Sequence, residues 1–136
     1  MLPVVDLELE DKYSSLKLSL YLNAALVALK ASTPLAAPDA RVAIKHATSA
    51  LNLDGDAVNQ SGKRKLSDAE KAKALYRRAV AQLAVKEEAA AIADLEQAAK
   101  LVPADAAIQR ELAAAKKTVD AKKAKSRAAY SKMFST

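Results

Sequence analysis

Residues that interrupt helices are rare in this chain and fall at a few places. The 136 residues include only two glycines and four prolines, so long stretches run without a helix-breaking residue. Hydrophobic residues make up 51% of the chain but aromatic residues only 4%, and most of the apolar residues are alanine and leucine. Small side chains of this kind suit closely packed helices better than sheets. The sequence therefore predicts one all-α domain over residues 1–136.

Five helices are expected from the apolar spacing and from the start and stop signals. The first two span about residues 6–31 and 39–53. The third begins at a capping box formed by Ser67 and Glu70 and runs to about residue 85. The fourth follows a short turn and ends before Pro103, and the fifth, capped by Asp105, runs from 106 to about 133. The polar segment between the second and third helices is expected to be a loop.

Two segments of the chain are similar to each other. Residues 20–25 parallel 75–80, and residues 43–44 parallel 91–92. Small residues together with Leu95 and Pro103 lie where a tetratricopeptide repeat of about 34 residues needs them; the small residues are Ala79, Ala91 and Ala98. The predicted organisation is a first repeat over 16–54, a second over 71–104 and a C-terminal helix over 105–134. An unrelated alanine-rich bundle is the alternative that the pattern leaves open.

Several short segments resemble the tetratricopeptide-repeat domain of the forty-kilodalton-type cyclophilins, which are isomerase D-like co-chaperones. The matching segments are 20–23, 73–79, 93–95, 103–105 and 129–134. The resemblance covers roughly residues 16–134, and neither the cyclophilin domain nor the first repeat of the family has a counterpart here. It implies a module that binds the acidic C-terminal Met-Glu-Glu-Val-Asp peptide of the ninety-kilodalton heat-shock chaperone (the heat-shock protein 90 family).

Four cations cluster at the start of the third predicted helix. Lys73 and Arg77 are four residues apart and so share a helix face, and Lys71 and Arg78 crowd the same turn. No acidic residue occurs from 71 to 86. From the residues alone, an anion bound among these cations and a simple solvated basic face are both open interpretations.

The resemblance assigns roles to three residues. Asn23 would donate its amide to the terminal carboxylate of the peptide, Lys73 would pair with the carboxylates of the last residue, and Arg77 would reach the peptide backbone or an upstream acid. A structural role for Asn23 between neighbouring helices is the alternative. The clamp of the family uses five residues, and the two that lie on an earlier repeat have no match here. Because three repeats normally make a continuous core, the chain is expected to be either a fragment of a larger protein or a chain that self-associates over the missing surface.

The charge of the chain is concentrated in its second half. Residues 1–70 carry eight Lys/Arg and nine Asp/Glu, whereas residues 71–136 carry fourteen and seven, which together give the net charge of +6. The basic stretch 116–132 admits nucleic acid or a membrane surface as partners, but a solvated capping helix that projects into water is the preferred interpretation. In the related proteins the tail modulates chaperone binding, so Tyr130, Met133 and Phe134 are auxiliary candidates that would pack back on the groove or on the partner.

Nothing in the sequence predicts catalysis in this chain. There is no cysteine and one histidine, His46, and no phosphate-binding loop, carboxylate pair or metal-ligand spacing occurs. Asp94 and Glu96 are expected to be ordinary exposed acids. We therefore expect no cofactor, no metal and no enzyme activity, although the parent protein could be a peptidyl-prolyl isomerase. The N-terminus lacks the features of a signal peptide and no apolar run is long enough to span a membrane, so a cytoplasmic location is expected.

Overall fold

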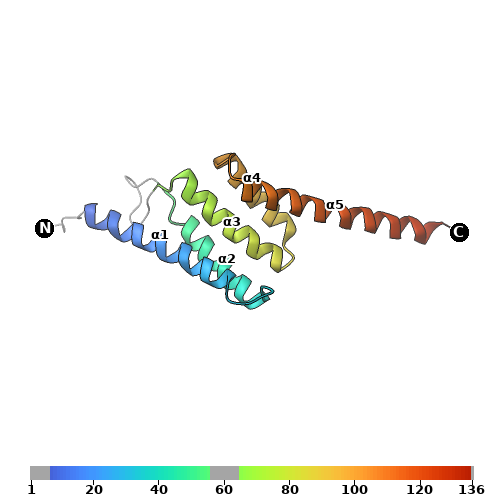
Figure 1. Cartoon of the computed structure of the whole chain (residues 1–136), viewed down its shortest axis with the longest axis horizontal. Coiled ribbons are helices and arrows are strands. Elements are labelled where there is room, and N and C mark those ends of the chain that lie inside the picture. The colour runs from blue at the N-terminus through green and yellow to red at the C-terminus, as the bar shows by residue number, and fades with distance from the viewer. Residues whose placement is uncertain (1–6, 56–64, 136) are drawn as a thin grey trace.

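The computed structural model describes residues 7–55 and 65–135, and the regular elements of these residues are all helices (Figure 1). They are α1 (Leu7–Leu29), α2 (Ala37–Leu51), α3 (Asp68–Ala84), α4 (Glu88–Leu101) and α5 (Ala106–Phe134). The all-α prediction is confirmed, and the helix ends differ from the predicted ones by at most a few residues, which is within the spread expected for fraying ends. Most of the predicted polar loop lies outside the described residues.

The helices pack as two consecutive hairpins followed by a long C-terminal helix (Figure 1). α1 packs against α2 and α3 against α4, while α2 also packs against α3 and so joins the two hairpins. α1 contacts α3, and α3 contacts α5, so these three helices form one side of the stack. This is the arrangement of tetratricopeptide-like helical hairpins, and it gives the chain a concave side lined by the first helix of each pair.

Alanine occupies the closest contacts between the helices. The fully buried alanines among the described residues lie on α1 to α4, and they are Ala25, Ala40, Ala43, Ala47, Ala50, Ala74, Ala79, Ala81, Ala91 and Ala98. Leucines fill the larger spaces, with Leu75 and Leu95 buried at the centre of the second hairpin. Because a methyl group lets two helix axes approach more closely than a longer side chain does, this pattern sets the narrow spacing of the stack.

Side-chain caps lie at the beginnings of α3 and α5, where the sequence predicts them. The Glu70 amide donates to Ser67 Oγ at 3.2 Å, and the Ser67 amide donates to Glu70 Oε1 at 2.8 Å, which completes the predicted capping box at α3. Asp105 Oδ1 accepts hydrogen bonds from the Ala107 and Ile108 amides at 2.9 and 3.2 Å. Both predicted caps are therefore confirmed.

The turn between α3 and α4 places a lysine in a conformation that favours glycine. Lys86 has a φ of 66°, and it follows the last residues of α3. The Glu87 amide donates to the Gln82 carbonyl at 2.9 Å, and the Lys86 amide donates to the Leu83 carbonyl at 3.2 Å. These two bonds form a Schellman motif, in which the left-handed position is usually glycine because a Cβ atom there is crowded.

Replacing Lys86 by glycine is expected to stabilise the fold. The Lys86→Gly change removes the crowding at the left-handed position, and the larger entropy of glycine in the unfolded chain offsets part of that gain. The expected net effect is a rise of about 0.5 kcal/mol in the free energy of unfolding. Urea titration followed by circular dichroism measures it, with Lys86→Ala as the control that keeps the Cβ atom. A glycine variant that is less stable than the alanine variant would contradict this account.

Candidate functional site

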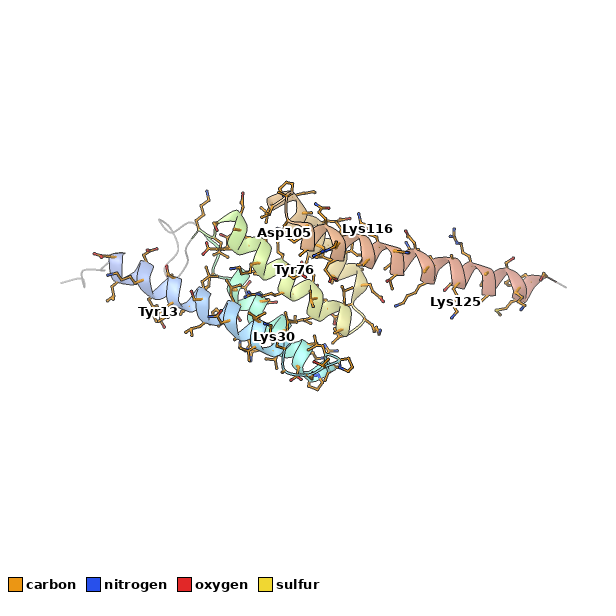
Figure 2. All side chains as sticks on the ribbon, in the orientation of Figure 1. Tyr13, Lys30, Tyr76, Asp105, Lys116 and Lys125 are labelled. Atoms are coloured by element: carbon orange, nitrogen blue, oxygen red, sulfur yellow. The ribbon has the colours of Figure 1, made fainter. Side chains whose placement is uncertain are left out.

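A groove of about 380 Å³ lies on the concave side of the stack, between α1, α3 and the start of α5. α3 forms its floor and contributes both polar and apolar side chains. Apolar side chains form the facing walls, and they include Leu26, Leu29, Val102 and Ile108. Tyr76 of α3 and Asp105 at the start of α5 lie together at the α5 side of the groove (Figure 2).

Lys73 and Arg77 both line this groove, one helical turn apart on α3. The Lys73 side chain is exposed, whereas Arg77 is half-buried. Arg77 Nη1 donates to the main-chain carbonyl of Leu22 at 2.6 Å and so ties α3 to α1. Burial lowers the pKa of the Arg77 guanidinium from its ordinary value, but an arginine stays charged at neutral pH. The groove therefore contains one accessible cation and one anchored cation.

Asn23 lies beside the groove and is not among the residues that line it. It is exposed on α1, one residue after Leu22, whose carbonyl accepts the Arg77 hydrogen bond. Leu26, three residues further along α1, is in the groove wall. The structure thus brings Lys73 and Arg77 together in the groove and places Asn23 at its α1 edge.

The other two cations of the predicted cluster have carboxylate partners from distant parts of the chain. Lys71 Nζ lies 3.0 Å from Asp54 Oδ2. Arg78 donates from Nε and Nη2 to the two carboxylate oxygens of Asp94, at 2.6 and 2.8 Å, and Nη1 lies 3.4 Å from the Thr48 hydroxyl. Arg78 therefore joins α3 to α4, and Lys71 joins α3 to the turn after α2, so neither of these two cations is part of the groove that Lys73 and Arg77 line.

Asp94 also corrects a second expectation. The sequence analysis treated it as an ordinary exposed acid, but it is buried with 7% of its surface exposed. It lies on the face of α4 that packs against α3, where the Arg78 guanidinium neutralises it. The position of Asp94 in the sequence could have indicated its burial, because Asp94 is adjacent to the buried Leu95 and four residues before the buried Ala98.

Tyr76 is a groove residue that the sequence analysis did not single out. Its side chain is half-buried beside Arg77. Burial raises the pKa of Tyr76 above its ordinary value of 10.0, and the nearby carboxylates of Glu111 and Asp105 raise it further. The hydroxyl is therefore protonated at neutral pH and can donate a hydrogen bond. Its position three residues after Lys73 on the same helix face is the sequence signal that could have revealed it.

The C-terminal candidates lie far from the groove. Tyr130, Met133 and Phe134 are 65, 76 and 70% exposed, and the last turns of α5 extend away from the rest of the stack (Figure 1). The Tyr130 and Phe134 rings contact each other, with centroids 4.9 Å apart. The suggestion that these side chains pack back on the groove is therefore wrong for this structure, whereas the predicted projection of the second half of α5 into solvent is confirmed.

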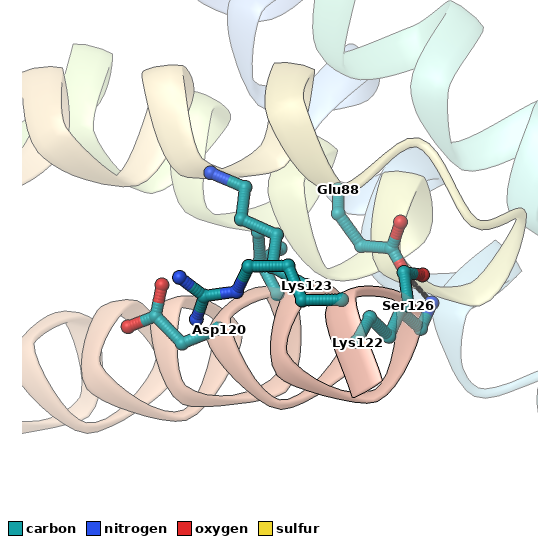
Figure 3. Close-up of a pocket in the computed structure, with 7 residues that line it drawn as sticks. Glu88, Asp120, Lys122, Lys123 and Ser126 are labelled. Atoms are coloured by element: carbon teal, nitrogen blue, oxygen red, sulfur yellow. Dashed lines mark hydrogen bonds and ion pairs between the residues drawn. The ribbon is translucent and has the colours of Figure 1, made fainter. Parts of the chain in front are cut away.

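A second, open hollow of about 640 Å³ lies between the start of α4 and the middle of α5. Glu88 of α4 reaches Lys122 of α5 there, and the two form an ion pair (Figure 3). The hydrogen bond from Lys122 lowers the pKa of Glu88. A second ion pair, between Lys116 and Glu96 at 3.0 Å, links the same two helices. Two ion pairs, one of them in this hollow, thus link α4 to α5.

The described part of the chain shows no sign of a metal site or a membrane span. No group of three or more histidine, cysteine, aspartate or glutamate side chains in residues 7–55 and 65–135 is placed to hold a metal ion. Over the same residues, no helix combines the length and the apolar character needed to cross a bilayer.

The sequence is similar to that of proteins named peptidyl-prolyl cis-trans isomerase D. It is 46% identical over 132 residues to the protein of that name from Mycosarcoma maydis, which covers 94% of this chain and 32% of the relative. It is 37% identical over 127 residues to the one from Cryptococcus neoformans var. neoformans serotype D (strain JEC21), which covers 93% of this chain and 31% of the relative. This chain is homologous to part of the isomerase D proteins.

The homology confirms the resemblance to isomerase D-like cyclophilins that the short motifs indicated. The chain spans about a third of the length of the curated relatives it matches. No protein-family model matches the chain. Similarity to the isomerase D proteins therefore rests on these pairwise alignments.

Loss of the Arg78 guanidinium is expected to destabilise the fold strongly. Arg78→Met keeps the length of the side chain but leaves the buried Asp94 carboxylate without its counter-charge, which should cost about 3 kcal/mol of the free energy of unfolding. Lys116→Met is the matched control, because its ion pair with Glu96 is half-exposed and should contribute less than about 1 kcal/mol. Urea titration of both variants tests this, and equal losses would show that burial of Asp94 has no energetic consequence.

Asp54 is expected to make the stability of the fold depend on pH in the acid range. Burial works to raise the pKa of Asp54, but the Leu66 amide and the Lys71 ammonium lower it below its ordinary value of 3.8. Ionised Asp54 therefore stabilises the fold above pH 3.8, and this contribution is lost as the pH falls through the lower pKa of the folded state.

Asp54→Asn removes the titrating group and is the variant that isolates this effect. It should be less stable than the wild type at neutral pH, and the two should converge as the pH falls to about 2. Thermal unfolding midpoints measured across this range test the prediction. A difference between the two proteins that stays constant with pH would contradict it.

Proposed function

We propose that this chain is a peptide-binding module of a co-chaperone, which takes the acidic C-terminal Met-Glu-Glu-Val-Asp peptide of a heat-shock protein 90 family chaperone in the groove between α1, α3 and α5. One observation carries the proposal. Among the described residues, Lys71 and Arg78 have carboxylate partners, whereas Lys73 and Arg77, the two cations of α3 that line the groove, have none. A ligand with carboxylates would complete the charge balance of this helix.

The groove has the chemistry that such a peptide requires. The Lys73 ammonium is exposed and can pair with the carboxylates of the terminal aspartate, and charge-assisted hydrogen bonds of this kind are stronger than neutral ones. Tyr76 lines the same groove and offers a hydroxyl donor. The leucine, valine and isoleucine side chains of the walls suit the valine and methionine of the peptide.

Arg77 and Asn23 would act at the α1 side of the same groove. The guanidinium holds α1 against α3 through the Leu22 carbonyl, and its remaining N–H groups can donate to the peptide backbone or to an upstream acid. Asn23, the next residue on α1, would turn its amide toward the terminal carboxylate. Arg77 would thus position the segment that carries Asn23 as well as bind the ligand.

Asp105 restricts where the peptide can lie. Its carboxylate lines the groove at the α5 side and would repel the acids of the ligand. Two α5 amides already occupy one of its oxygens, and the positive end of the helix dipole partly offsets its charge. The acidic end of the peptide is therefore expected closer to Lys73 and α1, with an apolar side chain facing α5.

Peptide titration by calorimetry tests the proposal. Lys73→Ala should weaken binding of the Met-Glu-Glu-Val-Asp peptide about tenfold to a hundredfold, because it removes one or two charge-assisted hydrogen bonds. Lys100→Ala is the matched control, since Lys100 is an exposed cation on α4 outside the groove. The same peptide with an amidated C-terminus should also bind more weakly.

Two results would overturn the assignment. If the wild-type chain gives no heat with the peptide, the groove does not bind this ligand. If Lys73→Ala and Lys100→Ala bind equally well, the ligand does not use the groove cation. Because only three of the five clamp residues of the related co-chaperones have counterparts here, the affinity is expected to be lower than that of a complete clamp.

The isomerase activity named for the relatives is proposed to belong to a part of those proteins that this chain does not match. None of the described groups in the groove forms a proton-transfer or nucleophile arrangement. This chain is therefore expected to show no activity in a prolyl isomerisation assay, although it still binds the peptide. The basic second half of α5 offers nucleic acid as a rival ligand, and binding to DNA that falls steeply with salt would favour that rival.

A further inference from the structure

Ser126 is an exposed residue in the basic second half of α5. The residues from 121 to 136 carry five cations and no acid, and the cations are Lys122, Lys123, Lys125, Arg127 and Lys132. Three of these cations lie directly around the serine, three and one positions before it and one position after it. The nearest acid before it is Asp120, six positions earlier. The peptide groove makes no use of this serine, which lies outside the groove lining.

Ser126 lies on the side of α5 that faces the start of α4. Val119, Lys122 and Ser126 follow one another at intervals of three and four residues, so they share one face of the helix. All three line the open hollow beside α4, together with Glu88 (Figure 3). Lys122, one turn before the serine, is the residue that pairs with Glu88. A group added to Ser126 would therefore lie beside this ion pair.

The hollow is formed by the second hairpin and α5 alone. Its lining comes from α4 and α5. Among the described residues, α1 contacts α2 and α3 but neither α4 nor α5. The surroundings of Ser126 therefore do not depend on how the outer face of α1 is covered.

The segment of α5 around Ser126 can open without disturbing the core. Ala115 is the last buried residue of the helix, and residues 121–135 are all exposed. A helical segment without tertiary packing is only marginally stable in water, and its local opening costs little free energy. A protein kinase binds the residues around its acceptor serine in an extended form. Local opening of α5 would give this segment the form that a kinase requires.

We propose that Ser126 is the acceptor of a protein kinase that selects basic residues on both sides of its target. Kinases discriminate among substrates by the pattern of charge around the acceptor, and Lys123, Lys125 and Arg127 supply cations before and after this serine. In the reaction, Ser126 Oγ forms a bond to the γ-phosphorus of ATP, the bond from that phosphorus to the β,γ-bridging oxygen breaks, and ADP leaves. The catalytic aspartate of the kinase accepts the hydroxyl proton.

The neighbouring hydroxyl residues of α5 have a less suitable pattern of charge. Thr118 has an acid, Asp120, two positions after it. Ser131 has one cation, Lys132, within three positions on either side. Ser126 has three cations and no acid in the same range. The charge pattern therefore singles out Ser126 among the hydroxyl residues of this part of the helix.

Phosphorylation of Ser126 redistributes the charges that link α4 to α5. A phosphoserine carries a charge of about −1.5 to −2 at pH 7. Lys122 and Lys123 lie four and three positions before it, which makes them its neighbours on the helix surface. The phosphate competes with Glu88 for the Lys122 ammonium and repels the Glu88 carboxylate. The modification thus weakens the ion pair between the start of α4 and the middle of α5.

Incubation of the full chain with ATP and the catalytic fragment of protein kinase C, followed by mass spectrometry, tests the site. Phosphate is expected on Ser126; Ser126→Ala should remove it, and Ser131→Ala, the matched control, should not. Arg127→Ala should lower kcat/KM of the kinase for this chain about tenfold, because the change removes one charge-assisted contact. Lys117→Ala removes a cation far from the serine and should have no effect. A chain without phosphate at Ser126, or one that Arg127→Ala leaves equally reactive, contradicts the proposal.

Titration of the Glu88 carboxyl by NMR tests the effect on the ion pair. The hydrogen bond from Lys122 lowers the pKa of Glu88 in the unmodified chain, so phosphorylation of Ser126 is expected to raise this pKa. In Lys122→Met the pKa of Glu88 should already be higher, and phosphorylation should raise it by less. A Glu88 pKa that phosphorylation leaves unchanged would show that the phosphate does not disturb the ion pair, and the proposed weakening would be wrong. Because Ser126 lies outside the groove, both tests are independent of peptide binding.

Discussion

The close approach of the helices, which alanine makes possible, is the constraint on which the rest of the structure depends. Fully buried alanines lie where α2 meets its neighbours and where α3 meets α4. Ala72 shows the consequence for the site, because it belongs to the core of the second hairpin and also lines the groove. A longer side chain at such a position would push the helices apart. The width of the groove is thus a direct result of the core packing.

The charges of α3 divide according to the direction in which each side chain points. Lys71 and Arg78 point toward other elements and join acids that the fold brings to them. Lys73 points into the groove and remains exposed, and Arg77 holds the edge of α1. A single basic helix therefore supplies both internal ion pairs and a surface suited to an anion. This division is stronger support for a carboxylate ligand than the basic character of the helix as a whole.

The local elements followed from the sequence alone. Each of the caps at Ser67 and Asp105 bonds to residues at most three positions further along the chain. The local sequence was therefore sufficient to predict where α3 and α5 begin. The helical spacing likewise placed Lys73 and Arg77 on one face. The repeat predicted the helical hairpins, and the short motifs indicated the sequence similarity to the isomerase D proteins.

Only the tertiary structure decided which of the predicted site residues are available to a ligand. Arg78 meets an acid 16 positions away and Arg77 meets a carbonyl 55 positions away. Such partners depend on the angle and distance at which helices stack, which no local pattern encodes. The same stacking buried Asp94 and brought Tyr76 and Asp105 to one wall. Hydrogen bonds along a helix join near neighbours in the chain, whereas charge pairing and burial depend on helices that are distant in sequence.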